Sequence, residues 1–61
     1  AEIFIPLGSS LTGLTLPQLA FRYKYNLIVL AIQRNTATYY EDLEDMPIME
    51  GDTLLVKGLQ N

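Results

Sequence analysis

The sequence predicts a small α+β domain in which a strand, a helix and three further strands follow one another along the chain. The length of 61 residues and a hydrophobic content of 49% allow one globular domain, which we place over residues 1–61. Short apolar runs between turn residues are typical of strands, and one stretch has helical spacing. We therefore expect a mainly antiparallel sheet with one helix on a face.

Four segments are predicted to be strands, because they combine apolar or β-branched residues with turn residues at their ends. The first run ends before Pro6, and an Asn35-Thr36 turn joins the second run to the third as a hairpin. The last strand follows a turn at Gly51 and ends near Gly58. The expected strands are residues 2–5, 27–32, 37–40 and 53–56.

Residues 16–25 are predicted to form the helix. Thr15 is the expected N-cap, and Gln18 three residues later completes a capping box. Spacings of three and four residues place one set of side chains on a buried face, while Phe21 and Tyr25 lie on the opposite side. The predicted buried face consists of Leu16, Leu19, Ala20 and Tyr23.

The predicted strands lack the alternation of apolar and polar residues that a sheet with one solvated face shows. Residues 27–32 are all apolar, so both faces of the sheet require burial, whereas one helix covers only one of them. We therefore expect a second apolar surface that pairs with another copy of the chain or docks on a parent protein. The residues expected in this interface are Phe21, Tyr25, Ile28 and Leu30.

The alternative is that apolar loop residues fold back over the second face, in which case the domain needs no partner. A chain this short favours the partner, because a small domain buries only a modest share of its apolar surface. The loop residues that could cover the face are Leu7, Leu11, Leu14, Met46 and Met49.

The composition excludes several classes of function. The chain has no cysteine and no histidine, which excludes disulfides, zinc sites, haem ligation and the common catalytic triads. We expect no catalytic residue, no metal site and no cofactor. A net charge of −3 argues against nucleic acid as a partner. No apolar run reaches the ~20 residues of a membrane span. Because the sequence starts at a predicted strand without methionine, we expect it to be part of a longer protein.

The remaining polar candidates have structural explanations beside the functional ones. The acidic stretch at residues 41–45 offers oxygen ligands to a divalent cation, and it also serves as a solvated connector. Glu50 and Asp52 flank Gly51, where carboxylates usually make and cap a tight turn. Arg22 is one of four cations and is placed either to bind a phosphate group or to complement the helix dipole.

An ordered set of segments resembles a known family. The set consists of LTLPQLAFRYKY at 14–25, VLAIQR at 29–34 and EGDTLLVKG at 50–58, preceded by IFIP and a Gly8-Ser9 loop. These segments, which cover nearly the whole chain, resemble the TrkA-C domain, also called the C-terminal RCK domain. The resemblance implies an α+β domain that dimerises and is attached to a potassium channel or transporter, a cation/proton antiporter or a sodium-coupled anion symporter.

The resemblance also implies a ligand site. Some family members bind cyclic di-AMP at their two-fold interface, against apolar residues that open the helix, an arginine near its end and the start of the next strand. One position departs from the pattern of the binders: Ile28 stands where asparagine is often found, which removes a hydrogen bond to the base. The matching positions in this chain are Leu16, Leu19, Arg22, Leu27 and Val29.

Pattern and resemblance together predict a regulatory domain on the cytoplasmic side of the cell membrane, with no catalysis of its own. A ligand that prefers one arrangement of the paired domains would shift the population of that arrangement and thereby the attached gate. The expected partners are a second copy and the membrane-embedded part of a transporter, with cyclic di-AMP as the candidate effector. A purely structural dimerisation module and a weak divalent-cation sensor are the alternatives.

Overall fold

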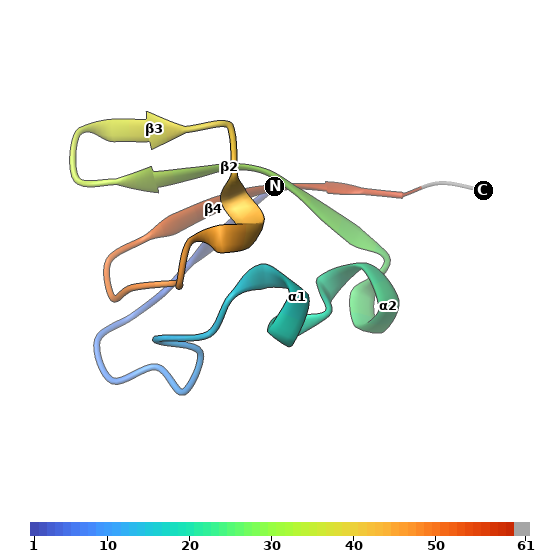
Figure 1. Ribbon diagram of the computed structural model, residues 1–61, viewed down its shortest axis with the longest axis horizontal. Helices are drawn as coiled ribbons and strands as arrows, with labels where there is room; N and C mark the ends of the chain where they lie inside the picture. The colour runs from blue at the N-terminus through green and yellow to red at the C-terminus, as the bar shows by residue number, and fades with distance from the viewer. Residues whose placement is uncertain (60–61) are drawn as a thin grey trace.

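The computed structural model describes residues 1–59 as a four-stranded sheet with two short helices packed on one side (Figure 1). The strands pair antiparallel throughout, in the order β1-β4-β2-β3. The predicted α+β class and the order of its elements are confirmed. The elements are β1 (Glu2–Phe4), α1 (Leu16–Leu19), α2 (Phe21–Tyr25), β2 (Leu27–Arg34), β3 (Ala37–Tyr39), the 3₁₀ helix η1 (Leu43–Asp45) and β4 (Thr53–Gly58).

The strands match the predicted ones with shifted ends. β2 extends to Arg34 and β4 to Gly58, each two residues further than expected, because Arg34 pairs with Ala37 of β3 and Gly58 pairs with Leu27 of β2. β1 and β3 each end one residue early. Ile5 stays tied to the turn before β4, since its N–H donates to the carbonyl of Asp52 and its carbonyl accepts from Gly51, both at 2.8 Å.

The predicted single helix is divided at Ala20, which adopts the left-handed conformation with φ 53° and ψ 41°. This residue changes the direction that the next turn faces, so the expected buried face does not continue into α2. Tyr23, predicted to be buried, is 91% exposed, whereas Phe21, predicted to face outward, packs half-buried against the core. The structure corrects both placements.

The start of α1 agrees with the prediction. The backbone N–H of Thr15 donates to Oε1 of Gln18 at 2.9 Å, as a capping box requires. The acidic connector differs from the expected irregular segment, because it forms η1 and buries Leu43 under the helices. Within residues 1–59, no helix has the length and apolar character needed to span a membrane.

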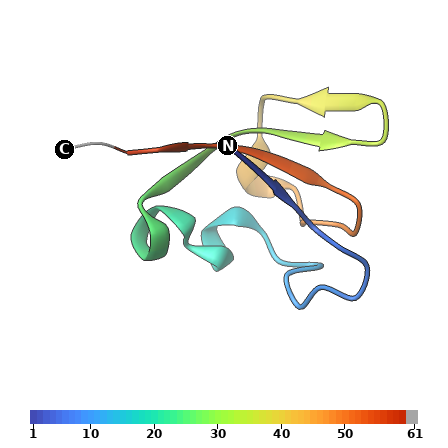
Figure 2. The same cartoon turned by 180° about the vertical axis from the view of Figure 1, so that it is seen from behind.

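The hydrophobic core lies between the helices and one face of the sheet, and both views show the helices on this side (Figure 2). Leu11, Leu14 and Met46 reach the core from the loops and pack against it. Strands, helices and loops therefore all contribute side chains to the core cluster. Its buried members are Ile5, Leu19, Ile32, Leu43, Ile48, Leu54 and Val56.

The other side of the sheet carries a second set of strand residues, which we call the open face. Side chains alternate between the faces along a strand, and cross-strand partners share a face. Leu54 and Val56 point into the core, so Leu55 between them lies on the open face with its partners. From the pairing register, the open face contains Glu2, Phe4, Ile28, Ala31, Gln33, Thr53, Leu55 and Lys57.

A register shift between Val29 and Ala31 leaves Leu30 as an extra residue on β2. Leu30 is 49% exposed, so the expectation that residues 27–32 are buried on both faces fails at this position. A bulge of this kind leaves one residue unpaired and bends the strand. It also lets Val29 and Ile32 both face the core, although three positions separate them.

The loop residues do not cover the open face. Leu11, Leu14 and Met46 pack on the helix side, as described above. Leu7 and Met49 are 86% and 45% exposed. The alternative in which these five residues fold back over the second face is therefore not what the structure shows.

Candidate functional site

A groove of about 480 Å³ opens where the two helices meet the first half of β2. Its walls are mostly apolar, and its polar groups come from Arg22 and Tyr23 on α2 and from Glu44 on η1. Small-molecule sites commonly have this character, with a few polar groups on a largely apolar wall. The other lining residues are Leu16, Pro17, Ala20, Phe21, Leu27, Ile28 and Val29.

The break at Ala20 shapes this groove. Because α2 restarts in a new direction after the left-handed residue, Phe21 turns toward the core while Arg22 and Tyr23 stay at the surface. The Phe21 and Tyr25 rings lie 6.0 Å apart at 47°, which supports α2 from its own side. A second left-handed residue, Asn26 with φ 56°, then directs the chain into β2. The groove is thus the space between a broken helix and the strand that follows it.

The structure brings together four of the five residues that the resemblance implies for a ligand. Leu16, Arg22, Leu27 and Val29 all line the groove. Leu19 does not, because it is only 7% exposed and belongs to the core cluster.

The residues expected in a dimer interface are distributed over α2 and β2. Phe21 packs against the core, and Tyr25 is exposed on α2. Ile28 and Leu30 both belong to β2. The pairing register places Ile28 on the open face, and Leu30 is the extra residue of the bulge. Phe21 and Ile28 also line the groove, so a helix residue and a strand residue of the predicted interface meet there.

The groove contains opposite charges that sequence spacing did not place together. Arg22 and Glu44 both line it, although 22 positions separate them in the chain. A guanidinium group suits a phosphate, which it can contact with two parallel hydrogen bonds. The Glu44 carboxylate opposes an anion, so a phosphate group is favoured only at the Arg22 end of the groove.

A buried ion pair between Arg34 and Asp52 ties the end of β2 to the turn before β4. Asp52 is fully buried, and its carboxylate accepts hydrogen bonds from Arg34 Nε at 2.9 Å, from Arg34 Nη2 at 2.7 Å and from the Met49 N–H at 2.9 Å. Arg34 Nη2 also donates to the carbonyl of Pro47 at 3.0 Å. The predicted role of Asp52 in capping the turn is confirmed through Met49. The partnership with Arg34 was not predicted.

The environment of this pair raises the pKa of Arg34 and lowers the pKa of Asp52, and both shifts favour the charged forms. Burial raises the pKa of Asp52, but the hydrogen bonds from Arg34 and Met49 outweigh it, so the pKa lies below its ordinary value. The hydrogen bonds to Asp52 raise the pKa of Arg34, against the opposing effect of burial. The ion pair therefore stays ionised at neutral pH and links β2 to the turn before β4.

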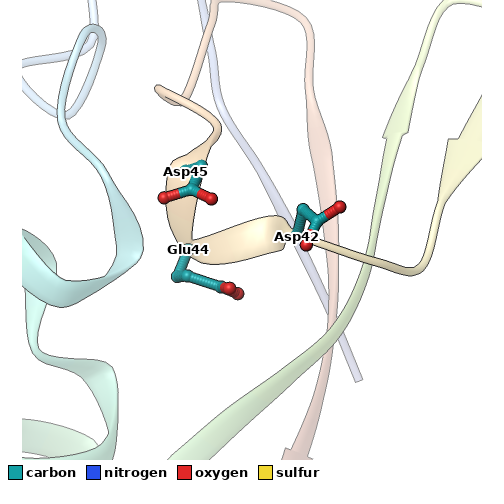
Figure 3. Close-up of side chains that lie close together, drawn as sticks. All are labelled: Asp42, Glu44 and Asp45. Atoms are coloured by element: carbon teal, nitrogen blue, oxygen red, sulfur yellow. The ribbon is translucent and has the colours of Figure 1, made fainter.

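Three carboxylates gather at η1, as Figure 3 shows. One carboxylate oxygen from each of Asp42, Glu44 and Asp45 lies within 4.8 Å of the other two, and all three residues are exposed. Exposed acidic groups of this kind are common on protein surfaces without a bound ion. This geometry agrees with the solvated connector that the sequence allowed at residues 41–45.

Comparisons with known proteins give the same family that the residues resemble. The family model of the TrkA-C domain matches residues 1–61. An "Uncharacterized transporter sll0640" of Synechocystis is 40% identical over 58 residues, and the "Uncharacterized transporter YfbS" of Escherichia coli K12 is 36% identical over 58 residues. No solved structure matches the chain significantly.

The matched region is a small part of these relatives. The 58 residues make up 95% of this chain but only 10% of either transporter. The family match, by contrast, extends over the whole chain, and the order of elements in the structure agrees with the α+β domain that the resemblance implied. The chain belongs to the TrkA-C domain family.

Proposed function

We propose that this chain is a regulatory domain of a membrane transporter and that the groove is its effector site. The observation that supports this most directly is the meeting of Leu16, Arg22, Leu27 and Val29 in one groove. Family membership and two relatives that are named as transporters support the attachment to a transport protein. The domain would act on the cytoplasmic side of the membrane, next to the membrane-embedded part.

The proposed effector is a nucleotide such as cyclic di-AMP. The apolar walls of the groove suit a planar base, and Arg22 supplies a guanidinium group for a phosphate. The chain carries a net charge of −3, which opposes a dianion. Two paired copies would offset that repulsion by presenting an Arg22 to each of the two phosphates.

The proposed mechanism is a shift between arrangements of the paired domains. The groove is bounded by α2 on one side and β2 on the other, so a ligand that contacts both favours one relative position of these elements. A ligand changes such an equilibrium only by the difference in its affinity for the two states. The attached transporter would respond to the population of the favoured state.

Calorimetry with cyclic di-AMP on the wild-type chain and on Arg22→Ala tests this proposal. We expect wild type to bind, and we expect the substitution to weaken binding by at least about tenfold, because a charge-assisted hydrogen bond contributes roughly 1.5–3 kcal/mol. Lys24→Ala is the matched control, since Lys24 is a cation of the same helix outside the groove. Its affinity should equal that of wild type.

Two results would contradict the nucleotide proposal. No heat from the wild-type chain at several hundred micromolar ligand would leave the structural module without a ligand as the better description. Equal losses in Arg22→Ala and Lys24→Ala would show that general charge, not the groove, attracts the nucleotide.

A further inference from the structure

Glu44 is the acidic side chain of the groove, and it comes from a different element than the cation. Arg22 stands on α2, whereas Glu44 belongs to η1, which contacts α1. Figure 3 shows Glu44 extending from η1 on the side of the first half of β2. Within residues 1–59, neither Arg22 nor Glu44 forms an ion pair, so the two charges of the groove do not neutralise each other.

The charges around Glu44 determine which part of a nucleotide can lie there. Carboxylate oxygens of Asp42 and Asp45 lie within 4.8 Å of one oxygen of Glu44. Three negative groups so close together repel a phosphate, which is left to Arg22. A nucleotide bound in the groove would therefore direct its base, not its phosphate, toward Glu44.

The Glu44 carboxylate has its acceptor atoms available for such a base. It accepts no hydrogen bond from any residue in the described part of the chain. A carboxylate offers two acceptor oxygens and no donor. It therefore complements a ligand edge that presents two donors side by side.

The two purine bases differ in this respect. The Watson–Crick edge of guanine presents N1–H and the N2 amino group as adjacent donors, whereas that of adenine presents the N6 amino group beside the N1 acceptor. One carboxylate can accept both donors of guanine through two parallel hydrogen bonds, as it does from a guanidinium group. With adenine, one oxygen accepts from N6 while the other faces the lone pair of N1, which it repels.

We propose that Glu44 reads the base of a nucleotide bound in the groove and favours guanine over adenine. This inference rests on the proposed effector site and names the base that the site prefers. Because Glu44 is exposed, water competes for its carboxylate. We therefore expect a preference of about tenfold, near the lower end of the discrimination that a bidentate contact to a base supplies.

Calorimetry with cyclic di-GMP, cyclic di-AMP and cyclic di-IMP on the same chain tests this role of Glu44. Wild type should bind cyclic di-GMP about tenfold more tightly than cyclic di-AMP. Hypoxanthine, the base of cyclic di-IMP, keeps N1–H but lacks the 2-amino group, so its affinity should lie between the other two.

Glu44→Gln should reverse the order of cyclic di-GMP and cyclic di-AMP. An amide offers one acceptor and one donor, which match the N6 amino group and N1 of adenine. Asp45→Asn is the matched control, because it removes one charge of the same acidic cluster at a residue that does not line the groove. It should leave the ratio of the two affinities at the wild-type value.

The ratio of affinities separates this inference from the proposed function. A reversed order in Glu44→Gln, with the wild-type order kept in Asp45→Asn, supports the inference. Equal affinities in wild type, tighter binding of cyclic di-AMP, or a ratio that Glu44→Gln leaves unchanged overturns the role of Glu44 and leaves the groove as an effector site. If none of the three ligands binds at several hundred micromolar, both the inference and the nucleotide proposal are overturned.

Discussion

Replacing Asp52 with asparagine will lower the free energy of unfolding by about 2–3 kcal/mol at neutral pH. The carboxylate is fully buried and accepts three hydrogen bonds, two of them from Arg34. Removing one partner of a buried ion pair usually costs about 3–5 kcal/mol, because the remaining charge is left uncompensated. We expect less here, since the Arg34 side chain is 29% exposed and can be hydrated in part.

This loss is large for a domain of this size. A chain of 61 residues has a total stability of roughly 3–9 kcal/mol at ordinary values per residue. Urea unfolding followed by circular dichroism measures the difference. Asp45→Asn is the matched control: Asp45 is exposed and its carboxylate forms no ion pair among the described residues. The control should change stability by less than about 0.5 kcal/mol.

The same carboxylate predicts how stability depends on pH. The pKa of Asp52 is lower in the folded chain than in the unfolded one, so the unfolded state binds this proton first as the pH falls. Its contribution is fully present above the ordinary aspartate pKa of about 3.9 and is lost as the pH falls below it. Asp52→Asn should therefore lose less stability than wild type between pH 5 and the acid range. If the free energy of unfolding falls by the same amount with pH in wild type and in Asp52→Asn, this role of Asp52 is contradicted.

Replacing Ile32 with alanine will lower the free energy of unfolding by about 3–4 kcal/mol, the larger of the two effects. Ile32 is fully buried on β2 and pairs with Leu54 of β4 at the centre of the core. Truncation of a buried isoleucine removes its transfer free energy and leaves a cavity, which together cost about 2–5 kcal/mol. We place the effect high in this range because the core cluster is small.

Thermal and urea unfolding of Ile32→Ala measure this effect. Leu7→Ala is a control of similar chemistry, since Leu7 is 86% exposed, and it should change stability by no more than about 0.5 kcal/mol. Equal effects of the two substitutions would show that Ile32 does not pack as the structure places it.

Much of the fold could be predicted from local pattern. The apolar runs, the Asn35-Thr36 turn and the capping box of Thr15 and Gln18 are all short-range signals, and each is confirmed. The division of the helix was not accessible in the same way. Ala20 has the highest intrinsic preference for a regular helix, so only tertiary packing of the following segment can account for its left-handed conformation.

Contacts between residues far apart in the chain could not be predicted from the local sequence pattern. Arg34 ends an apolar strand and Asp52 follows a turn glycine, and each has a local explanation that makes no reference to the other. Their pairing follows from the antiparallel register of β2 and β4, which the sequence did not determine. The resemblance named four of the residues that line the groove, but not the groove itself, and Glu44 lines it because η1 contacts α1.

The most direct test of the paired domain is an isotope-filtered NOE experiment on a mixture of labelled and unlabelled chains. Pairing that brings the two grooves to one cyclic di-AMP molecule predicts intermolecular NOEs that involve the α2 residues Arg22 and Tyr23, which line the groove. A concentrated sample with cyclic di-AMP that shows no intermolecular NOEs, or shows them only to residues away from the groove, would contradict it.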